Sequence, residues 1–257
     1  MTHIIDSNVH LSHWPFRRLP LDETSALVAK LRHEKVVQAW AGSFDALLHK
    51  DIGGVNERLV DECHKHKNFL IPFGSVNPKL PDWDEDLRRC HEQWKMPGIR
   101  LHPNYHGYKL DDPDFSRLLK LAAERNLIVQ LVVRMEDKRT QHPLVNAPPV
   151  DLTPLPDIVK KIPKLRLVLL NAYPHLPLAL LLKIVAAGQV FVEIATLENV
   201  GGVSNLTKQI PLERILFGSH APFFILESAL LKLKESALTD AQLEAITQGN
   251  ARRLLVT

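Results

Sequence analysis

Three polar side chains alternate with apolar ones near the start of the chain. Side chains of a strand point to opposite faces in turn, so the spacing predicts that Asp6, Asn8 and His10 share one face. Ile5 and Val9 would then take the other face. Because the flanking residues indicate a buried parallel strand, such a row is typical of a site, where carboxylate and imidazole groups could exchange protons or bind a metal ion.

Polar residues recur where later apolar runs end. They are Arg100 and His102, Gln130 and Arg134, Asn171, Glu193 and His220. Their alternating neighbours are apolar, namely Ile99, Leu101, Val129, Leu131 and Val133. If the apolar neighbours pack against helices, the polar set faces inward and converges on one site. The alternative for any single member is an ordinary strand-end group that caps a loop.

Strand and helix patterns alternate along the whole chain. Strands are predicted over residues 4–10, 36–43, 69–76, 98–102, 127–134, 165–171, 190–195 and 215–219. Helices are predicted over residues 22–34, 54–66, 82–95, 112–126, from 153 and over 178–187, with an extra C-terminal helix from 239. Eight such units predict one (β/α)8 TIM barrel over residues 1–257. An open doubly wound sheet is the alternative, but no Gly-x-Gly-x-x-Gly follows a strand.

Several helix starts carry capping signals. Asp82 with Glu85, and Thr239 with Gln242, have the spacing of a capping box. Asp112 precedes a proline, which is favoured at the first position of a helix.

Composition excludes several classes of protein. With 257 residues, 45% of them hydrophobic and 24% charged, the chain can build one barrel. A formal charge of +3 with scattered basic residues argues against a nucleic-acid partner. Polar residues and prolines interrupt the most apolar stretch, 165–188, so no membrane partner is expected. Cys63 and Cys90 match no zinc or redox spacing, and no leader is evident, which together predict a cytoplasmic location.

Four stretches resemble the amidohydrolase superfamily, in its branch that contains aminocarboxymuconate semialdehyde decarboxylase and the 2-pyrone-4,6-dicarboxylate lactonases. Asp6-x-Asn8-x-His10 is similar to the Asp-x-His-x-His opening of that family. Residues 98–103 (GIRLHP) resemble its strand-four segment, and residues 214–223 (RILFGSHAPF) its strand-eight segment, usually Gly-Ser-Asp-x-Pro. Residues 249–255 resemble its C-terminal helix. The resemblance implies a TIM-barrel hydrolase, or a decarboxylase, acting on a small carboxylate-bearing molecule.

The metal ligands depart from the family pattern. Family members generally use two histidines on strand one, one or two more after strands five and six, and an aspartate at strand eight. The corresponding positions here hold Asn8, His10, Val132 or Gln130, Asn171 and His220. Amides are poor zinc ligands, so we expect the usual metal centre to be absent. The alternative is one divalent ion, zinc first, held by His10 and His220 with His102 as a third ligand.

Metal-free hydrolysis, as in the lactonases, would give each of these residues a role. His220 would be the general base, because a neutral imidazole near its reference pKa accepts a proton at pH 7. His10 or His102 would donate to the oxyanion, with Asn8 and Asn171 as neutral donors. Contacts to a small anionic substrate are assigned to Arg100, Arg134, Trp14, Tyr105, Gln130 and Glu193. Arg100 and Arg134 would bind its carboxylate.

Three further expectations concern a loop that could cover the site, an apolar helix on the surface and the alternative functions. The long, proline-rich loop 134–151 is the candidate lid. Helix 178–187 is apolar nearly all round, which predicts a homo-oligomer contact or a cover formed by the C-terminal segment. The rival functions are a metal-dependent hydrolase or decarboxylase with rearranged ligands, and a catalytically silent barrel that binds a small acid or a partner. A closed internal hydrogen-bond network would favour the silent barrel, and an open pocket would favour an enzyme.

Overall fold

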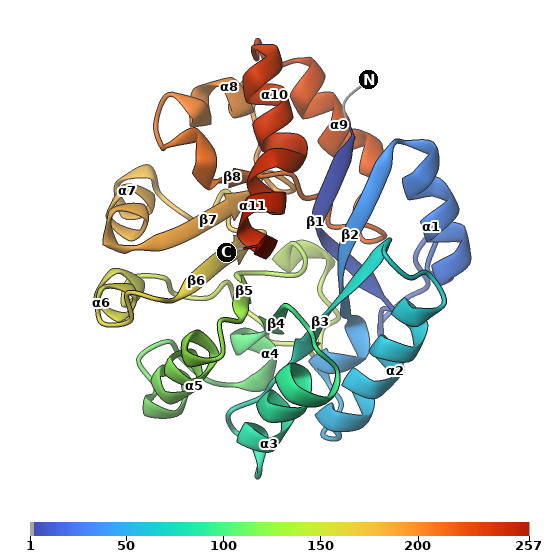
Figure 1. The fold of residues 1–257 in the computed structure, drawn as a ribbon, viewed down its shortest axis with the longest axis vertical. Coiled ribbons are helices and arrows are strands. Elements are labelled where there is room, and N and C mark those ends of the chain that lie inside the picture. The colour runs from blue at the N-terminus through green and yellow to red at the C-terminus, as the bar shows by residue number, and fades with distance from the viewer. Residues whose placement is uncertain (1–2, 257) are drawn as a thin grey trace.

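Eight parallel strands form a nearly closed barrel in this computed structural model, which describes residues 3–256 (Figure 1). The strands are β1 Ile4–Leu11, β2 Val36–Ser43, β3 Leu70–Ser75, β4 Gly98–Leu101, β5 Ile128–Val132, β6 Arg166–Leu170, β7 Gln189–Glu193 and β8 Ile215–Leu216. Each pairs with the next in chain order. The ends of the sheet meet where the Ser7 amide donates to the Phe217 carbonyl at 3.0 Å and the His10 amide to Ala221 at 2.9 Å. The predicted TIM barrel is confirmed.

Helices surround the strands. They are α1 Thr24–His33, α2 Ile52–His64, α3 Trp83–Arg88, α4 Pro103–His106, α5 Pro113–Glu124, α6 Leu155–Lys160, α7 Leu178–Ala187, α8 Gly202–Thr207, α9 Leu226–Lys234, α10 Asp240–Glu244 and α11 Asn250–Val256. Short 3-10 turns lie at Phe44–Leu47, Lys138–Thr140 and Leu212–Arg214, and π turns at Arg89–Gln93 and Ala245–Gly249.

The predicted caps have mixed outcomes. The capping box of Thr239 with Gln242 forms, and the Asp112 side chain accepts from the Asp114 amide, so both predictions are confirmed. The capping box at Asp82 is wrong, because that residue adopts a left-handed backbone conformation and its side chain caps nothing.

Apolar side chains fill the barrel on both sides of its wall. Ile99, Leu101, Val129, Leu131 and Val133 pack outward in the cluster shared with the helices, as the alternation predicts. An inner cluster contains Ile5, Ile128, Phe191, Leu216 and Leu254. Leu254 belongs to α11, which lies across the start of β6, where the Arg166 guanidinium donates to its carbonyl at 2.7 Å (Figure 1). Helix α11 thus covers the amino-terminal end of the barrel, and the polar site lies at the opposite end, where the strands end.

The face pattern predicted for the first strand is partly wrong. Ile5 belongs to the inner cluster, but Val9 packs outward against the helices. The pairing register with β2 shifts between Asp6 and Val9, and such an irregularity moves following side chains to the other face.

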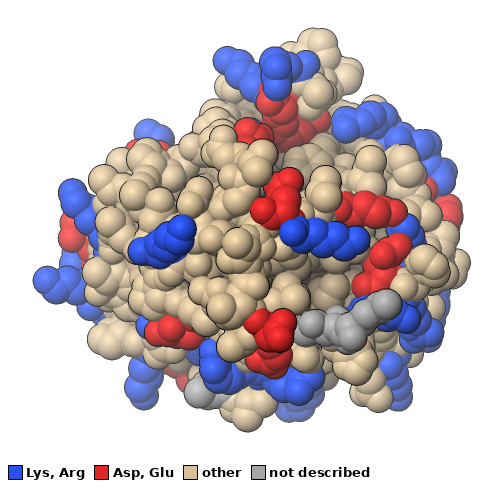
Figure 2. Space-filling view, turned by 90° about the horizontal axis from the view of Figure 1, so that it is seen from above, with Lys and Arg blue, Asp and Glu red and all other residues tan. Residues whose placement is uncertain are grey.

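The outer surface bears on the predictions for helix 178–187, for charge and for membrane contact. Leu178 and Leu182 of α7 are each 43% exposed, so the alternative that the C-terminal segment covers this helix is wrong. Basic and acidic side chains are interspersed on the face shown in Figure 2. None of the helices between residues 3 and 256 combines the length and apolar character needed to cross a bilayer.

Candidate active site

The guanidinium of Arg100 lies fully buried inside the barrel. It donates to the carbonyls of Val9 at 2.7 Å and Trp40 at 3.0 Å, to Gln130 Oε1 at 2.7 Å and to His10 Nε2 at 3.1 Å. Burial lowers the pKa of Arg100 to about 9, so the group stays charged at pH 7. All of these partners belong to the protein, so Arg100 holds the interior together.

A second buried network joins three strands. Asn8 Nδ2 donates to Asn171 Oδ1 at 2.8 Å, and the Asn171 amide donates to Glu193 Oε1 at 2.6 Å. Burial raises the pKa of Glu193, and these hydrogen bonds oppose the rise. Nearby, Asp6 accepts from the amide of Ser219 at 3.0 Å and from its hydroxyl, and burial raises the pKa of Asp6 to about 7. Most polar groups in this lower part of the site bond to each other, although Asn8 Oδ1 has no partner among the described residues.

Two histidines lie edge to face above these networks. The rings of His10 and His220 are 5.2 Å apart, and His220 Nε2 lies 2.8 Å from the Met135 carbonyl. A carbonyl only accepts, so Nε2 of His220 carries the proton and its Nδ1 holds the lone pair. Burial lowers the pKa of His220 to about 3. The expectation that His220 keeps a reference pKa is therefore wrong, because the apolar surroundings disfavour the imidazolium.

Aromatic side chains close the mouth of the barrel over this pair. Successive ring centroids lie 4.8 Å apart for His10 and Phe44, 5.4 Å for Phe44 and Trp14, 4.9 Å for Trp14 and Phe223, and 5.0 Å for Phe223 and His220. With the contact between the two histidines they form a closed ring, which we call the aromatic closure. It excludes water from His10 and His220 in this conformation.

Several buried polar atoms next to the closure have no hydrogen-bond partner among residues 3–256. They are His10 Nδ1, both ring nitrogens of His102, Trp14 Nε1, the Tyr105 hydroxyl and Glu136 Oε1. An unsatisfied buried polar group costs about 1–3 kcal/mol, so such groups are normally satisfied by water or a ligand. They lie at or after the ends of β1, β4 and β5, so the upper part of the site holds buried donors and acceptors that the described residues leave unsatisfied.

Arg134 lies at the rim, away from Arg100. Its Nη1 donates to His175 Nε2 at 3.1 Å, and it forms no ion pair within the described residues. Both side chains line a cavity of about 450 Å³ between the candidate lid and the loops after β6 and β7. The Arg134 carbonyl also accepts from Asn171 Nδ2 at 2.9 Å, which connects this cavity to the buried networks.

The sequence of the chain matches one family model. The amidohydrolase model covers residues 5–256. The chain belongs to the amidohydrolase family. No curated protein sequence matches it.

Solved structures share the fold of this amidohydrolase-family barrel. The 5-carboxyvanillate decarboxylase from Sphingomonas paucimobilis has a TM-score of 0.79 at 12% identity, covering 100% of this chain and 99% of its own. The 2,6-dihydroxybenzoate decarboxylase from Rhizobium has 0.72 at 14%, with the same coverage. An uncharacterised TIM-barrel protein from Bordetella bronchiseptica has 0.76 at 14%, covering 99% and 98%. At these identities the likeness shows the fold alone.

The metal that the amidohydrolase family implies does not fit the donors at this mouth. His10 Nε2 accepts from the Arg100 cation, and His220 Nε2 carries a proton toward Met135. The amides of Asn8 and Asn171 bond to each other. Bound zinc needs several free lone pairs from His, Cys or carboxylate groups, and this arrangement does not present them together.

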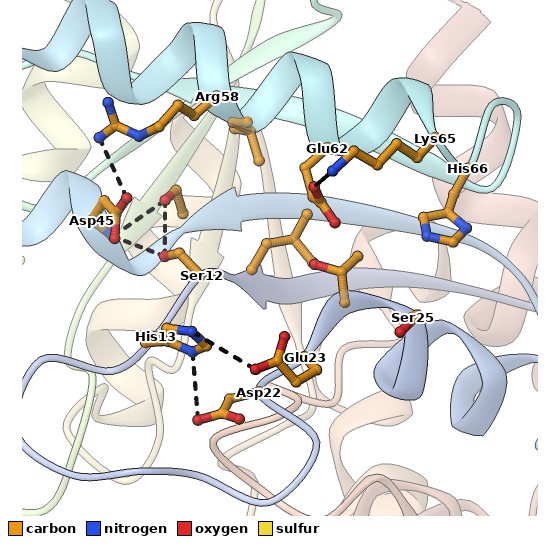
Figure 3. A pocket seen from close by; sticks show the side chains of 14 residues that line it. Ser12, His13, Asp22, Glu23, Ser25, Asp45, Arg58, Glu62, Lys65 and His66 are labelled. Carbon is orange, nitrogen blue, oxygen red and sulfur yellow. Dashed lines mark hydrogen bonds and ion pairs between the residues drawn. The ribbon is translucent and has the colours of Figure 1, made fainter.

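Within residues 3–256, one group of three His, Cys, Asp or Glu side chains is close enough to hold a metal, and it lies elsewhere. His13, Asp22 and Glu23 line a separate pocket of about 480 Å³ beside α1 and α2 (Figure 3). Arg18 already pairs with Asp22 at 2.7 Å and with Glu23 at 3.3 Å.

The structure brings together most of the predicted site residues. His10, His220, Asn8, Asn171, Gln130, Glu193 and Arg100 meet inside the barrel, and His102, Trp14 and Tyr105 lie at its mouth. Arg100 and Arg134 do not form a joint clamp. Sequence reasoning missed Phe44 and His175, although each follows a strand end closely enough to be a candidate.

Gly42 on β2 makes room for the interior arginine. A Cβ at this position would lie 2.8 Å from Arg100 Cδ and Nη1. We expect Gly42→Ala to lower the free energy of unfolding by about 1–3 kcal/mol, because the guanidinium cannot move without losing its carbonyl partners. Gly202→Ala is the control, since its added methyl meets Leu197 at ordinary contact distance. Equal stabilities of the two variants in urea denaturation would contradict the assigned packing.

Proposed function

We propose that this amidohydrolase-family protein is a metal-independent hydrolase that cleaves an ester or lactone bond in a small carboxylic acid at the mouth of its barrel. The observation that carries the proposal is the set of buried polar atoms without a partner at His10, which belongs to the aromatic closure, and at His102 and Tyr105 next to it. A polar molecule with several acceptor atoms would satisfy them. The apolar rings around it would strengthen those hydrogen bonds by excluding water.

Two features support a carboxylate on the substrate. Arg134 forms no ion pair within the described residues, and with His175 it lines a cavity of about 450 Å³ that Glu136, Asp137 and Glu198 also line. A guanidinium binds a carboxylate with two parallel hydrogen bonds. A substrate negative charge near His220 would also raise the pKa of that imidazole, which burial has lowered to about 3.

The hydrolytic step follows from the hydrogen-bond roles of the two histidines. The lone pair on His220 Nδ1 takes a proton from water as the water oxygen bonds to the ester carbonyl carbon. The Nδ1–H of His10 donates to the oxyanion that forms. When the carbon–oxygen ester bond breaks, the leaving oxygen recovers the proton from His220 Nδ1. No oxidant, reductant or further reactant is needed.

Entry to this site requires the aromatic closure to open. Loop residues of the β1–α1 connection contact the candidate lid, since Phe16 stacks on His142 at 5.7 Å and Arg17 lies 3.5 Å from Glu136. Arg17 also lies over the Phe223 ring at 5.1 Å. Parting of these contacts would connect the cavity at Arg134 to the two histidines.

Decarboxylation is the second candidate. It is favoured by the low pKa of His220, about 3, which makes activation of water demanding. A carboxylate that loses CO2 needs a proton donor at carbon, and no attacking water. A screen of dicarboxylic lactones and of unsaturated or aromatic acids, scored for ring opening and for CO2 release, separates the two reactions. Turnover of neither class would favour the silent barrel, which the largely internal hydrogen bonds of the lower networks also support.

Arg134 provides the test of carboxylate recognition. We expect Arg134→Gln to raise the KM of an acidic substrate, or the Kd of an acidic ligand, by about 10- to 100-fold, since a hydrogen bond to a charged group contributes about 1.5–3 kcal/mol. Arg117→Gln is the control, because Arg117 of α5 is 58% exposed, pairs with Asp84 and lies outside the lining of this cavity. Equal effects of both changes in calorimetric titrations would place the carboxylate elsewhere.

A further inference from the structure

The contact between Arg100 and His10 decides which nitrogen of His10 carries a proton. An arginine guanidinium has donors and no acceptor. Since Arg100 Nη1 lies 3.1 Å from His10 Nε2, that nitrogen must present its lone pair. The proton of neutral His10 is then on Nδ1, which is buried and has no partner among the described residues.

His220 holds the opposite tautomer. Its Nε2–H donates to the Met135 carbonyl at 2.8 Å, which leaves the lone pair on Nδ1. Asn171 Nδ2 lies 3.4 Å from Nδ1 and 3.5 Å from Nε2, so the shorter contact with the Met135 carbonyl is what assigns the tautomer. The two adjacent rings therefore offer one donor and one acceptor to the upper part of the site.

The place of the guanidinium is built into the barrel wall. Main-chain carbonyls of Val9 and Trp40 accept from it on two strands, and Gln130 accepts from a third. Gln130 is in turn held by the Ser7 carbonyl at 2.7 Å. Gly42 leaves the space that its side chain fills. These contacts define the position of a single positive charge beside His10.

We propose that Arg100 is the resident cation of this barrel, a positioning residue that holds His10 as the Nδ1–H tautomer and excludes a divalent metal ion from His10 Nε2. Zinc bound to a histidine nitrogen lies about 2.0–2.1 Å from it along the lone pair. That position lies on the contact between His10 and Arg100, and the charge of the guanidinium repels a second cation. The inference concerns the resting protein and holds whichever reaction the site performs.

The tautomers can be measured on the unaltered chain. Nitrogen-15 NMR of labelled histidines, with the two signals assigned through His10→Gln and His220→Gln, should show His10 protonated at Nδ1 and His220 at Nε2 at pH 7. Protonation of His10 at Nε2 would overturn the proposal, because Arg100 could not then donate to it. A side chain that only filled space would not determine which nitrogen of His10 carries the proton, so the NMR measurement separates positioning from packing.

Zinc titration tests the exclusion of metal. Chelator-treated protein should take up no zinc at the barrel mouth. Any zinc binding seen by calorimetry should then come from the separate cluster of His13, Asp22 and Glu23. That binding should be lost in His13→Ala, which removes one of the three ligands. Binding should be unchanged in His10→Ala. One equivalent of zinc that survives His13→Ala and is lost in His10→Ala would overturn the proposal.

Variants of Arg100 complete the test. In Arg100→Gln the Nδ1–H preference of His10 should be lost or mixed, whereas Arg100→Lys should restore part of it, because lysine keeps the charge and a donor. An unchanged His10 tautomer in folded Arg100→Gln would contradict the proposal. If neither variant folds, the NMR and zinc results on the unaltered interior decide it.

Discussion

Replacement of His220 by asparagine is expected to lower the kcat of the proposed hydrolysis by about 10²- to 10⁴-fold, the usual contribution of a positioned acid–base group. An asparagine amide has no lone pair that can take the proton of the attacking water at neutral pH. The change preserves a donor toward the Met135 carbonyl, which His220 Nε2 contacts at 2.8 Å. KM should change much less, because Arg134 would still bind the carboxylate.

The control for this change is His33→Asn. His33 is 79% exposed on α1 and pairs with Glu34, far from the barrel mouth. Its kcat should equal that of the unaltered protein. Turnover of a confirmed substrate at an unchanged rate in folded His220→Asn would show that another group is the base. A comparable loss in His33→Asn would point to a defect in folding.

Asp6→Asn is expected to remove a large pH dependence of stability. Burial raises the pKa of Asp6 from 3.8 to about 7, so the folded state binds a proton that the unfolded state has released between these values. The contribution of Asp6 is therefore most favourable below pH 4 and is lost as pH rises to 7. The loss is on the order of 4 kcal/mol for a pKa difference of about three units.

Asparagine can replace the protonated aspartic acid without breaking its contacts. Its Oδ1 can accept from the amides of Asn8 and Ser219, and its Nδ2 can donate to the Ser219 hydroxyl. The stability of Asp6→Asn relative to the unaltered protein should thus increase between pH 4 and pH 8 in urea titrations. The buried histidines titrate in both proteins, so their effects cancel in this difference.

Asp84→Asn is the control for the pH experiment. Asp84 is half exposed and pairs with Arg117 at 3.0 Å, so its removal should leave the pH dependence of stability unchanged. A difference between Asp6→Asn and the unaltered protein that stays constant from pH 4 to pH 8 would mean that Asp6 keeps an ordinary pKa when folded.

Local patterns along the chain were sufficient to predict the architecture. Alternating apolar runs and helix signals determine eight units, because strand and helix periodicities depend on near neighbours. The same alternation placed Arg100 and Gln130 inside the barrel, since their apolar neighbours must pack on helices. The convergence of His10, Asn171 and His220 followed as well, because carboxyl ends of parallel strands meet at one end.

The tertiary structure alone decided what each of these groups can do. The register shift between Asp6 and Val9 depends on pairing with β2, and Ile5 lies on the inner face, opposite to its prediction, whereas Val9 packs outward as predicted. The low pKa of His220 comes from burial, in which the adjacent Phe223 is itself covered by Trp14 of the distant β1–α1 loop. Spacing along a chain carries no information about which side chains will desolvate it.

The same distinction applies to charge and metal. From the sequence by itself we predicted that most of the family's metal ligands are missing, because residue type alone shows amides at Asn8 and Asn171, where the resemblance implies histidines. Only the folded barrel decided that Arg100 donates a hydrogen bond to the lone pair of His10 Nε2, since that contact joins β4 to β1 across the interior. Hydrogen-bond partners, unlike ligand types, are set by three-dimensional proximity, and so the positions of protons at this site follow from the fold.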